Sequence, residues 1–259
     1  MDFEGCWLAE ARGATPLIDG RTISSGSCGA DGRGRRKERD PGMRQVEWEG
    51  VTDRSDFLPG HVSQIDRLAN AARNARWAEV LDLLAKTPNA VNRPRIGGTS
   101  GYTVLHHAAW NGAPPDVVRR LLDLGAWRRL RSTRGQLPVD LAARRGHAHL
   151  IDLLRPAPAH PVADDVLAAL EQRLHQLVTS RMAEFRITRV LRLPQVAPLT
   201  ELVEPVMWFP VPGMYGGFAI ELQGPELQVK SWCRVLGGSA RTHRITARDM
   251  MMVESGWDI

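Results

Sequence analysis

The middle of the chain repeats one arrangement of apolar and polar positions three times. The copies begin at Leu68, Leu105 and Val139, and within each copy the apolar residues recur with the spacing of a helix. Copies one and two are 37 residues apart, as shown by the pairs Leu68 and Leu105, Ala72 and Ala109, and Leu84 and Leu121. Copies two and three are 33 to 34 residues apart, as shown by the pairs Ala108 and Ala142, Gly112 and Gly146, and Leu121 and Leu154. Each copy predicts two short helices that stack on the next copy.

The second copy carries the most specific motif. It reads GYTVLHHAA, then NG, then VVRRLLDLGA, and this run resembles the ankyrin repeat, whose signature is T-P-L-H-x-A at a period of about 33 residues. The third copy departs from it, with Leu137 at the threonine position and Asp140 at the histidine position, and the first copy has no such turn motif. The resemblance covers about residues 62–156. It implies a short α-solenoid of about three repeats.

Two adjacent histidines, His106 and His107, stand in this motif. They could be metal ligands, a catalytic base with its neighbour, or part of the scaffold. The resemblance implies the last role for His106, because the threonine and histidine of an ankyrin repeat hydrogen-bond around the turn that begins the first helix; here these are Thr103 and His106. We expect His107 to face outward. A metal site would need further ligands at a recognisable spacing, and we expect none.

After Arg155 the stretch PAPAHP predicts a boundary, and an amphipathic helix follows it. Its apolar stripe consists of Val166, Leu167, Leu170, Leu174, Leu177 and Val178, and Asp164 is the expected N-cap. We assign the linker and this helix to residues 157–185. We expect the helix to cover the exposed apolar face of the last repeat, because an uncapped end of a repeat stack is sticky.

From about residue 186 the pattern changes to short strands. The segments 216–223, 226–235, 241–247 and 250–255 alternate or are rich in β-formers, with GP and GGS turns between them, whereas 205–217 reads as a proline- and aromatic-rich connection. Residues 186–259 are therefore predicted to form a small antiparallel sheet of about four strands. The predicted fold class is α + β: an ankyrin-repeat solenoid, a linker helix and a β-rich C-terminal domain.

The first 42 residues differ from the rest, because they are rich in Gly, Ser, Arg and Asp without an apolar period. Such a segment cannot bury enough surface to fold, so we expect a disordered tail, with translation starting at Met43 as one possibility. Residues 43–61 are the expected lead-in to the repeats. The basic run from Arg33 to Arg39 could serve as a nucleic-acid patch or nuclear signal, but its acidic neighbours dilute it.

Charge and composition limit the kinds of partner and cellular compartment to expect. The net charge is +5, and residues 57–155 hold fifteen basic and seven acidic residues. Such a basic block favours an acidic partner, although an arginine-rich coding bias explains it equally well. The sequence contains no apolar run long enough for a membrane span and no secretion signal at its start, and its three cysteines are scattered. These features predict a cytoplasmic protein without a membrane anchor, metal or cofactor, for which nucleic acid is a minor alternative partner.

Catalytic motifs are weak. Cys233, His243 and Asp249 could form a nucleophilic triad, but Cys233 lies between Trp232 and Arg234 in a strand-like run, which favours a packed thiol. The sequence has no phosphate-binding glycine motif, metalloprotease motif or nucleophile elbow.

The resemblance also implies where a partner binds. In ankyrin proteins the end of each first helix and the fingers between repeats line the recognition surface. Equivalent helix positions hold Arg73, Trp110 and Arg144, and the next row includes Asn111 and Arg145. The fingers carry Arg93, Arg95, Arg128, Arg129, Arg131 and Arg134. The candidate binding residues are therefore Arg73, Trp110, Asn111, Arg128, Arg129, Arg144 and Arg145. The alternative is that Trp110 packs against its neighbours and the arginines are only solvated.

Two classes of function follow. The first is a non-enzymatic interaction module, in which the basic concave face of the repeats binds an acidic protein or peptide. The second is an enzyme or toxin-system component, with its activity in the C-terminal domain and the repeats selecting the target. A close pocket holding Cys233 and His243 would favour the second class.

Overall fold

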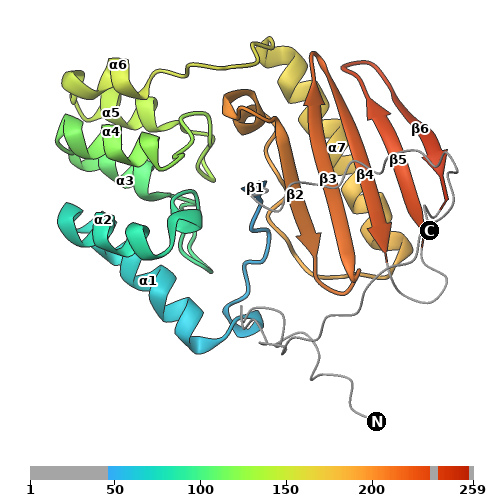
Figure 1. The fold of residues 1–259 in the computed structure, drawn as a ribbon, viewed down its shortest axis with the longest axis horizontal. Helices are drawn as coiled ribbons and strands as arrows, with labels where there is room; N and C mark the ends of the chain where they lie inside the picture. Colours follow the sequence, from blue (N-terminus) through green and yellow to red (C-terminus); the bar gives the residue numbers. More distant parts are fainter. Residues whose placement is uncertain (1–45, 234–238, 257–259) are drawn as a thin grey trace, which may run out of the picture. The chain divides into compact units, whose positions relative to one another are not determined.

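A computed structural model describes residues 46–233 and 239–256 of the chain. The predicted tail, residues 1–42, and the possible start at Met43 lie outside the described residues. Within this part of the chain, a stack of helices precedes a long helix and a six-stranded sheet (Figure 1). The α + β class predicted from the sequence is thus observed.

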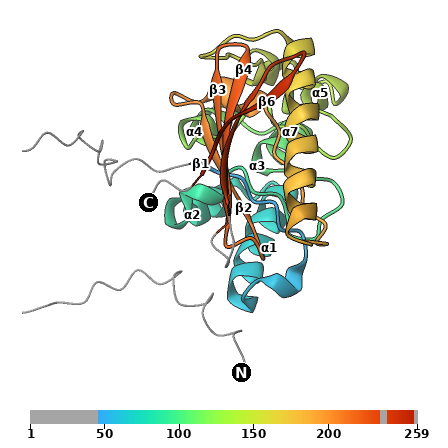
Figure 2. The ribbon, with the colours of Figure 1, turned by 90° about the vertical axis from the view of Figure 1, so that its right-hand side faces the viewer.

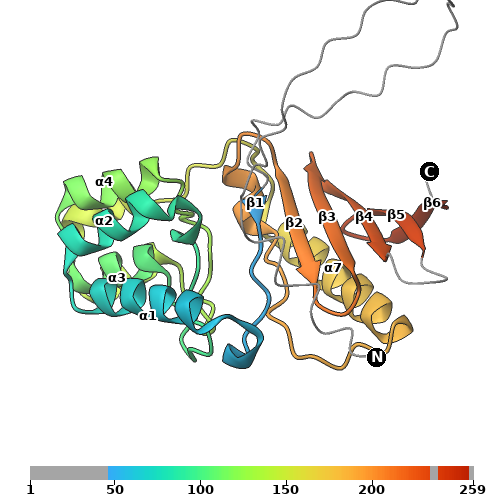
Figure 3. The same cartoon turned by 60° about the horizontal axis from the view of Figure 1, so that its bottom comes forward.

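The repeat region consists of paired helices in two layers (Figure 3). The first helices of the pairs are α1 (Pro59–Arg73), α3 (Val104–Asn111) and α5 (Pro138–Arg144). The second helices are α2 (Trp77–Lys86), α4 (Pro115–Asp123) and the short α6 (Ile151–Leu154), which a 3-10 turn, η3 (Ala148–Leu150), precedes. Another 3-10 turn, η2 (Pro88–Ala90), follows α2.

Alanines and leucines fill the space between these layers, as the repeat pattern requires. Ala72, Ala109 and Ala142 are fully buried where first helices approach one another, and the leucines Leu84, Leu121 and Leu154 are fully buried in the second helices. Small side chains permit close helix approach, and the larger ones fill the remaining core. The repeats therefore bury one continuous core along the stack.

Gly112 ends α3 in a left-handed conformation, with φ of 64°. A Cβ atom at this position would lie 2.6 Å from the His147 ring. That ring packs here because its Nε2 lies 3.1 Å from the Trp110 carbonyl oxygen. Only glycine satisfies both the backbone conformation and the close approach of the next repeat.

The long helix α7 (Asp164–Glu184) was predicted correctly in extent but wrongly in its packing and its cap. Its apolar stripe is buried in one core with Phe218, Ile220 and Val229 of the sheet, and does not cap the last repeat. Figure 2 shows the helix along one face of the sheet. The N-cap residue is Ala163, without a side-chain hydrogen bond, and Asp164 instead forms an ion pair with Arg129.

The sheet has six strands in the order of the chain: β1 (Val46–Glu47), β2 (Val206–Val211), β3 (Gly216–Gln223), β4 (Glu226–Cys233), β5 (Ala240–Ile245) and β6 (Met250–Ser255). β1 runs parallel to β2, and every other neighbouring pair is antiparallel. The last four strands match the prediction closely. The predicted count of about four was too low.

β2 was not predicted, because Pro210 lies within it and a proline usually indicates the end of a strand. In the structure β1 pairs only with Met207 and Trp208 of β2. Beyond Trp208, β2 therefore has no second neighbouring strand among the described residues. Pro210 lies in this edge segment, where a missing backbone N–H is tolerated.

Residues 43–61 were expected as a lead-in to the repeats, but Val46 and Trp48 pack in the C-terminal core, whereas Phe57 packs with the repeats. Trp48 follows β1, is 1% exposed, and packs with the sheet residues. Its Nε1 donates a hydrogen bond of 2.7 Å to the carbonyl oxygen of Arg192, which lies between α7 and β2. A short 3-10 turn, η1 (Arg54–Asp56), then leads into α1.

The second finger of the repeats, residues 127–136, packs on the C-terminal part of the chain. Leu130 is fully buried in the same core as α7 and the sheet. The main chain of Arg131 exchanges two hydrogen bonds with the Gln195 side chain, of 2.8 and 2.9 Å. Its guanidinium forms an ion pair with Glu171 of α7. This finger is thus part of an internal interface.

Candidate binding surface

Thr103 and His106 form the brace that the sequence resemblance implied. The Thr103 amide donates to His106 Nδ1 at 3.3 Å, the Thr103 hydroxyl lies 2.9 Å from the same nitrogen, and His106 Nε2 lies 3.3 Å from the Gln136 carbonyl oxygen. Burial lowers the pKa of His106 to about 4, so the ring is neutral at pH 7. Nδ1 accepts and Nε2 donates, which links the start of α3 to the second finger.

His107, which was expected to face outward, is half-buried and so only partly exposed. The edge of its ring meets Tyr102, with centroids 5.5 Å apart, and Tyr102 stacks on His106 at 5.4 Å. Burial, and to a smaller extent the positive charges of Arg73 and Arg95, lower the pKa of His107 to about 4. His107 is therefore a neutral donor or acceptor surrounded by cations.

Trp110 is partly exposed and lies beside this pair. The Arg145 guanidinium stacks over its ring, 4.7 Å from the centroid, and Tyr102 lies 6.5 Å away on a tilted plane. A guanidinium over an indole face is favourable and leaves the guanidinium edge available for hydrogen bonds. Trp110 is therefore not enclosed between repeats.

The remaining first-helix candidates differ in their availability. Arg73 and Arg144 are exposed, and neither they nor Arg145 form an ion pair with any described residue. Asn111 donates to the carbonyl oxygens of Ala72 and Arg73, at 3.2 and 3.3 Å. Its amide connects α3 to α1, which gives it a structural contact whether or not it meets a partner.

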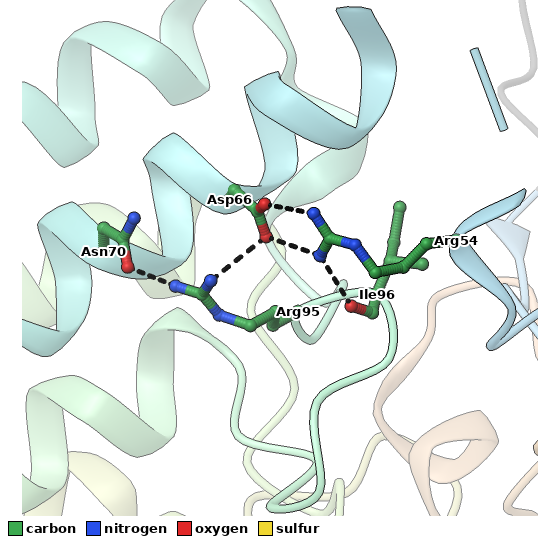
Figure 4. Close-up of polar contacts among 5 residues, drawn as sticks. All are labelled: Arg54, Asp66, Asn70, Arg95 and Ile96. Carbon is green, nitrogen blue, oxygen red and sulfur yellow. Dashed lines mark hydrogen bonds and ion pairs between the residues drawn. The ribbon is translucent and has the colours of Figure 1, made fainter. Parts of the chain in front are cut away.

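The first finger is held to α1 by a network centred on Asp66 (Figure 4). Arg54 makes two hydrogen bonds to the carboxylate, of 2.6 and 3.1 Å, and Arg95 makes another of 3.1 Å. Arg95 also contacts the Asn70 side chain, and Arg54 donates to the Ile96 carbonyl oxygen at 3.2 Å. The Arg54 hydrogen bond is the main reason that the pKa of Asp66 lies below its ordinary value. Asp66 could not be predicted as the centre of this network, since a lone aspartate on a helix belongs to no motif.

Arg128 and Arg129, also selected from the sequence, contact other parts of the chain and do not lie with the first-helix candidates. Arg128 Nε donates to the Leu153 carbonyl oxygen at 2.9 Å. Arg129 pairs with Asp164, and its amide donates to Glu201 at 3.1 Å. The acidic residues that these finger arginines meet thus belong to the same chain.

We give the name basic aromatic surface to these residues at and beside the first helices: Arg73, Tyr102, His107, Trp110, Arg144 and Arg145. Tyr102 was missed because the position before the turn threonine has no required residue type. Residues 83–142, from α2 to α5, match the family model described as "Ankyrin repeats (many copies)". The chain contains ankyrin repeats. Ankyrin repeats indicate a protein–protein interaction module.

The C-terminal part does not assemble the triad considered from the sequence. Cys233 is buried at the end of β4, and the strand register places His243 opposite Val229. Val229 is four residues from Cys233 along β4, a separation of about 13 Å for extended chain. In residues 46–233 and 239–256, no group of three His, Cys, Asp or Glu side chains is placed to hold a metal ion. Nor does any helix there have the length and apolar character to cross a membrane.

Proposed function

We propose that the ankyrin repeats of this protein bind an acidic protein segment through the basic aromatic surface, in a non-enzymatic role. The observation that supports this is a contrast between arginines. Arg54, Arg93 and Arg95 are all paired with carboxylates of the chain. Arg145 stacks over Trp110, and the charge of Arg73 acts on the neighbouring His107. Neither these two arginines nor Arg144 pairs with a carboxylate among the described residues.

The chemistry of this surface suits carboxylates next to an apolar side chain. Trp110 supplies a partly exposed indole, and Trp and Arg are enriched among the residues that dominate binding energy. Unpaired arginines attract an acidic segment over distance and then form charge-assisted hydrogen bonds with it. His107, which is neutral at pH 7, adds a polar group without opposing an acidic partner.

The test is a pair of charge reversals measured against a partner captured with the intact protein and then purified. Arg144→Glu with Arg145→Glu is expected to lower the association rate, most strongly at low ionic strength. Arg119→Glu with Arg120→Glu, at exposed positions of α4, makes the same change in net charge away from the surface. If both double variants associate equally fast, the partner does not use the basic aromatic surface.

A further inference from the structure

A cavity of about 410 Å³ lies between the repeats and the C-terminal part of the chain. Its lining comes from the segment after α2, the end of α4, the second finger, β1 with the residues after it, Arg192, and the end of the 3-10 turn η4 (Ala197–Glu201). Apolar wall residues include Val46, Val91, Leu122, Leu124, Trp127 and Leu202. This volume lies in the range of sites that hold small organic molecules.

Six charged side chains line the cavity, three acidic and three basic: Glu47, Glu49, Glu201, Arg93, Arg128 and Arg192. The acidic groups are engaged within the chain except for one buried oxygen of Glu201. Glu49 and Glu47 face Arg93, at 3.1 and 3.8 Å. One oxygen of Glu201 accepts from the Arg129 amide at 3.1 Å, and the other is buried and therefore out of contact with the cavity.

The donors of Arg192 are largely unused. Its guanidinium stacks over the Trp48 ring at 4.3 Å and donates to the Glu49 carbonyl oxygen at 3.2 Å. It forms no ion pair with any described residue, and burial lowers its pKa to about 10. Since a guanidinium carries five N–H donors, several remain for a ligand.

Arg128 adds a second cation with spare donors. The contact described for its guanidinium is the hydrogen bond from Nε to the Leu153 carbonyl oxygen. Burial raises the pKa of Glu201 on the cavity wall, and the positive charge of Arg128 partly opposes that effect. Because the unpaired oxygen of Glu201 is not accessible, the unused hydrogen-bonding groups on Arg192 and Arg128 are donors.

We propose that this cavity binds a small, singly charged organic anion, with its anionic group held by Arg192 and Arg128 and its apolar body against Leu122, Leu124 and Trp127. A planar guanidinium matches a carboxylate or phosphate oxygen pair. The three carboxylates on the wall limit the positive charge of the site, which favours a monoanion over a polyanion. This site is separate from the basic aromatic surface and does not depend on the function proposed for it.

The test uses the full chain and two probes of matched shape and opposite charge, benzoate and benzylamine. Isothermal titration at pH 7.5 and constant ionic strength is expected to show saturable binding of benzoate and none of benzylamine. Arg192→Gln should weaken benzoate binding about tenfold or more, because it removes charged hydrogen bonds in a desolvated site. Near-ultraviolet circular dichroism of the wild type should change on benzoate binding, since Trp48 lies against Arg192.

Controls separate this site from general effects. Arg120→Gln, at an exposed position of α4, should bind benzoate as the wild type does. If Arg192→Gln does not fold, Arg128→Gln carries the test, with an expected severalfold loss of affinity. The proposal is overturned if benzoate does not saturate the wild type, if benzylamine binds as well, or if the folded arginine variants bind benzoate unchanged.

Discussion

Trp48 and Trp127 stack with their rings within 5° of parallel and their centroids 6.5 Å apart. The first residue follows the parallel strand β1, and the second begins the second ankyrin finger. They are 1% and 7% exposed. This pair, with Leu130 beside it, joins the repeats to the C-terminal core, so the two parts are expected to unfold together.

A double-mutant cycle tests this junction. Trp127→Ala is expected to lower the free energy of unfolding by about 3–5 kcal/mol, as for other large buried aromatics. In a cycle of Trp48→Leu and Trp127→Leu, which removes the aromatic rings, a coupling of about 0.5–1.5 kcal/mol should appear beyond the sum of the single effects. Urea unfolding followed by far-ultraviolet circular dichroism provides the measurement. Additive single effects would show that the two rings do not stabilise each other.

Features formed by residues close together in the sequence could be predicted, whereas contacts between distant residues could not. The brace between Thr103 and His106 spans three residues and belongs to a recurring turn, so the motif predicted it. The docking of the second finger depends on Trp48, Glu171 and Gln195, which are distant in sequence and follow no pattern. The same limit applies to α7, whose amphipathic stripe predicted a helix but could not distinguish the sheet from the last repeat as its partner.

The two adjacent histidines give the protein a dependence on pH. The pKa of each is lowered to about 4, mainly by burial, from an ordinary value of 6.5. The folded state therefore binds fewer protons than the unfolded state between these values. The histidine contribution to stability is complete above pH 6.5 and is lost as the pH falls toward 4. Each histidine should add a slope of about 1.4 kcal/mol per pH unit within that window.

Urea unfolding of the wild type and of His107→Gln, at several values between pH 7.5 and 5, isolates one of these slopes. The difference between the two proteins cancels the other titrating groups, including His61 and His243, whose pKa values are also lowered by burial. The variant should lose stability less steeply as the pH falls. Parallel curves would mean that His107 is accessible to protons in the folded state.

Trp110→Ala tests the centre of the basic aromatic surface. The ring is partly exposed and lies under Arg145. Without it, a bound partner should lose apolar contact and dissociate faster. A loss of about 2 kcal/mol, typical of a residue that dominates an interface, corresponds to a rate increase of about thirtyfold. Surface plasmon resonance against the captured partner measures the dissociation rate.

Trp77→Ala is the matched control, because Trp77 is also a partly buried tryptophan of the repeat core but begins α2. It should lower the free energy of unfolding without changing the dissociation rate. Equal dissociation from both variants would show that Trp110 acts only through the stability of the repeats.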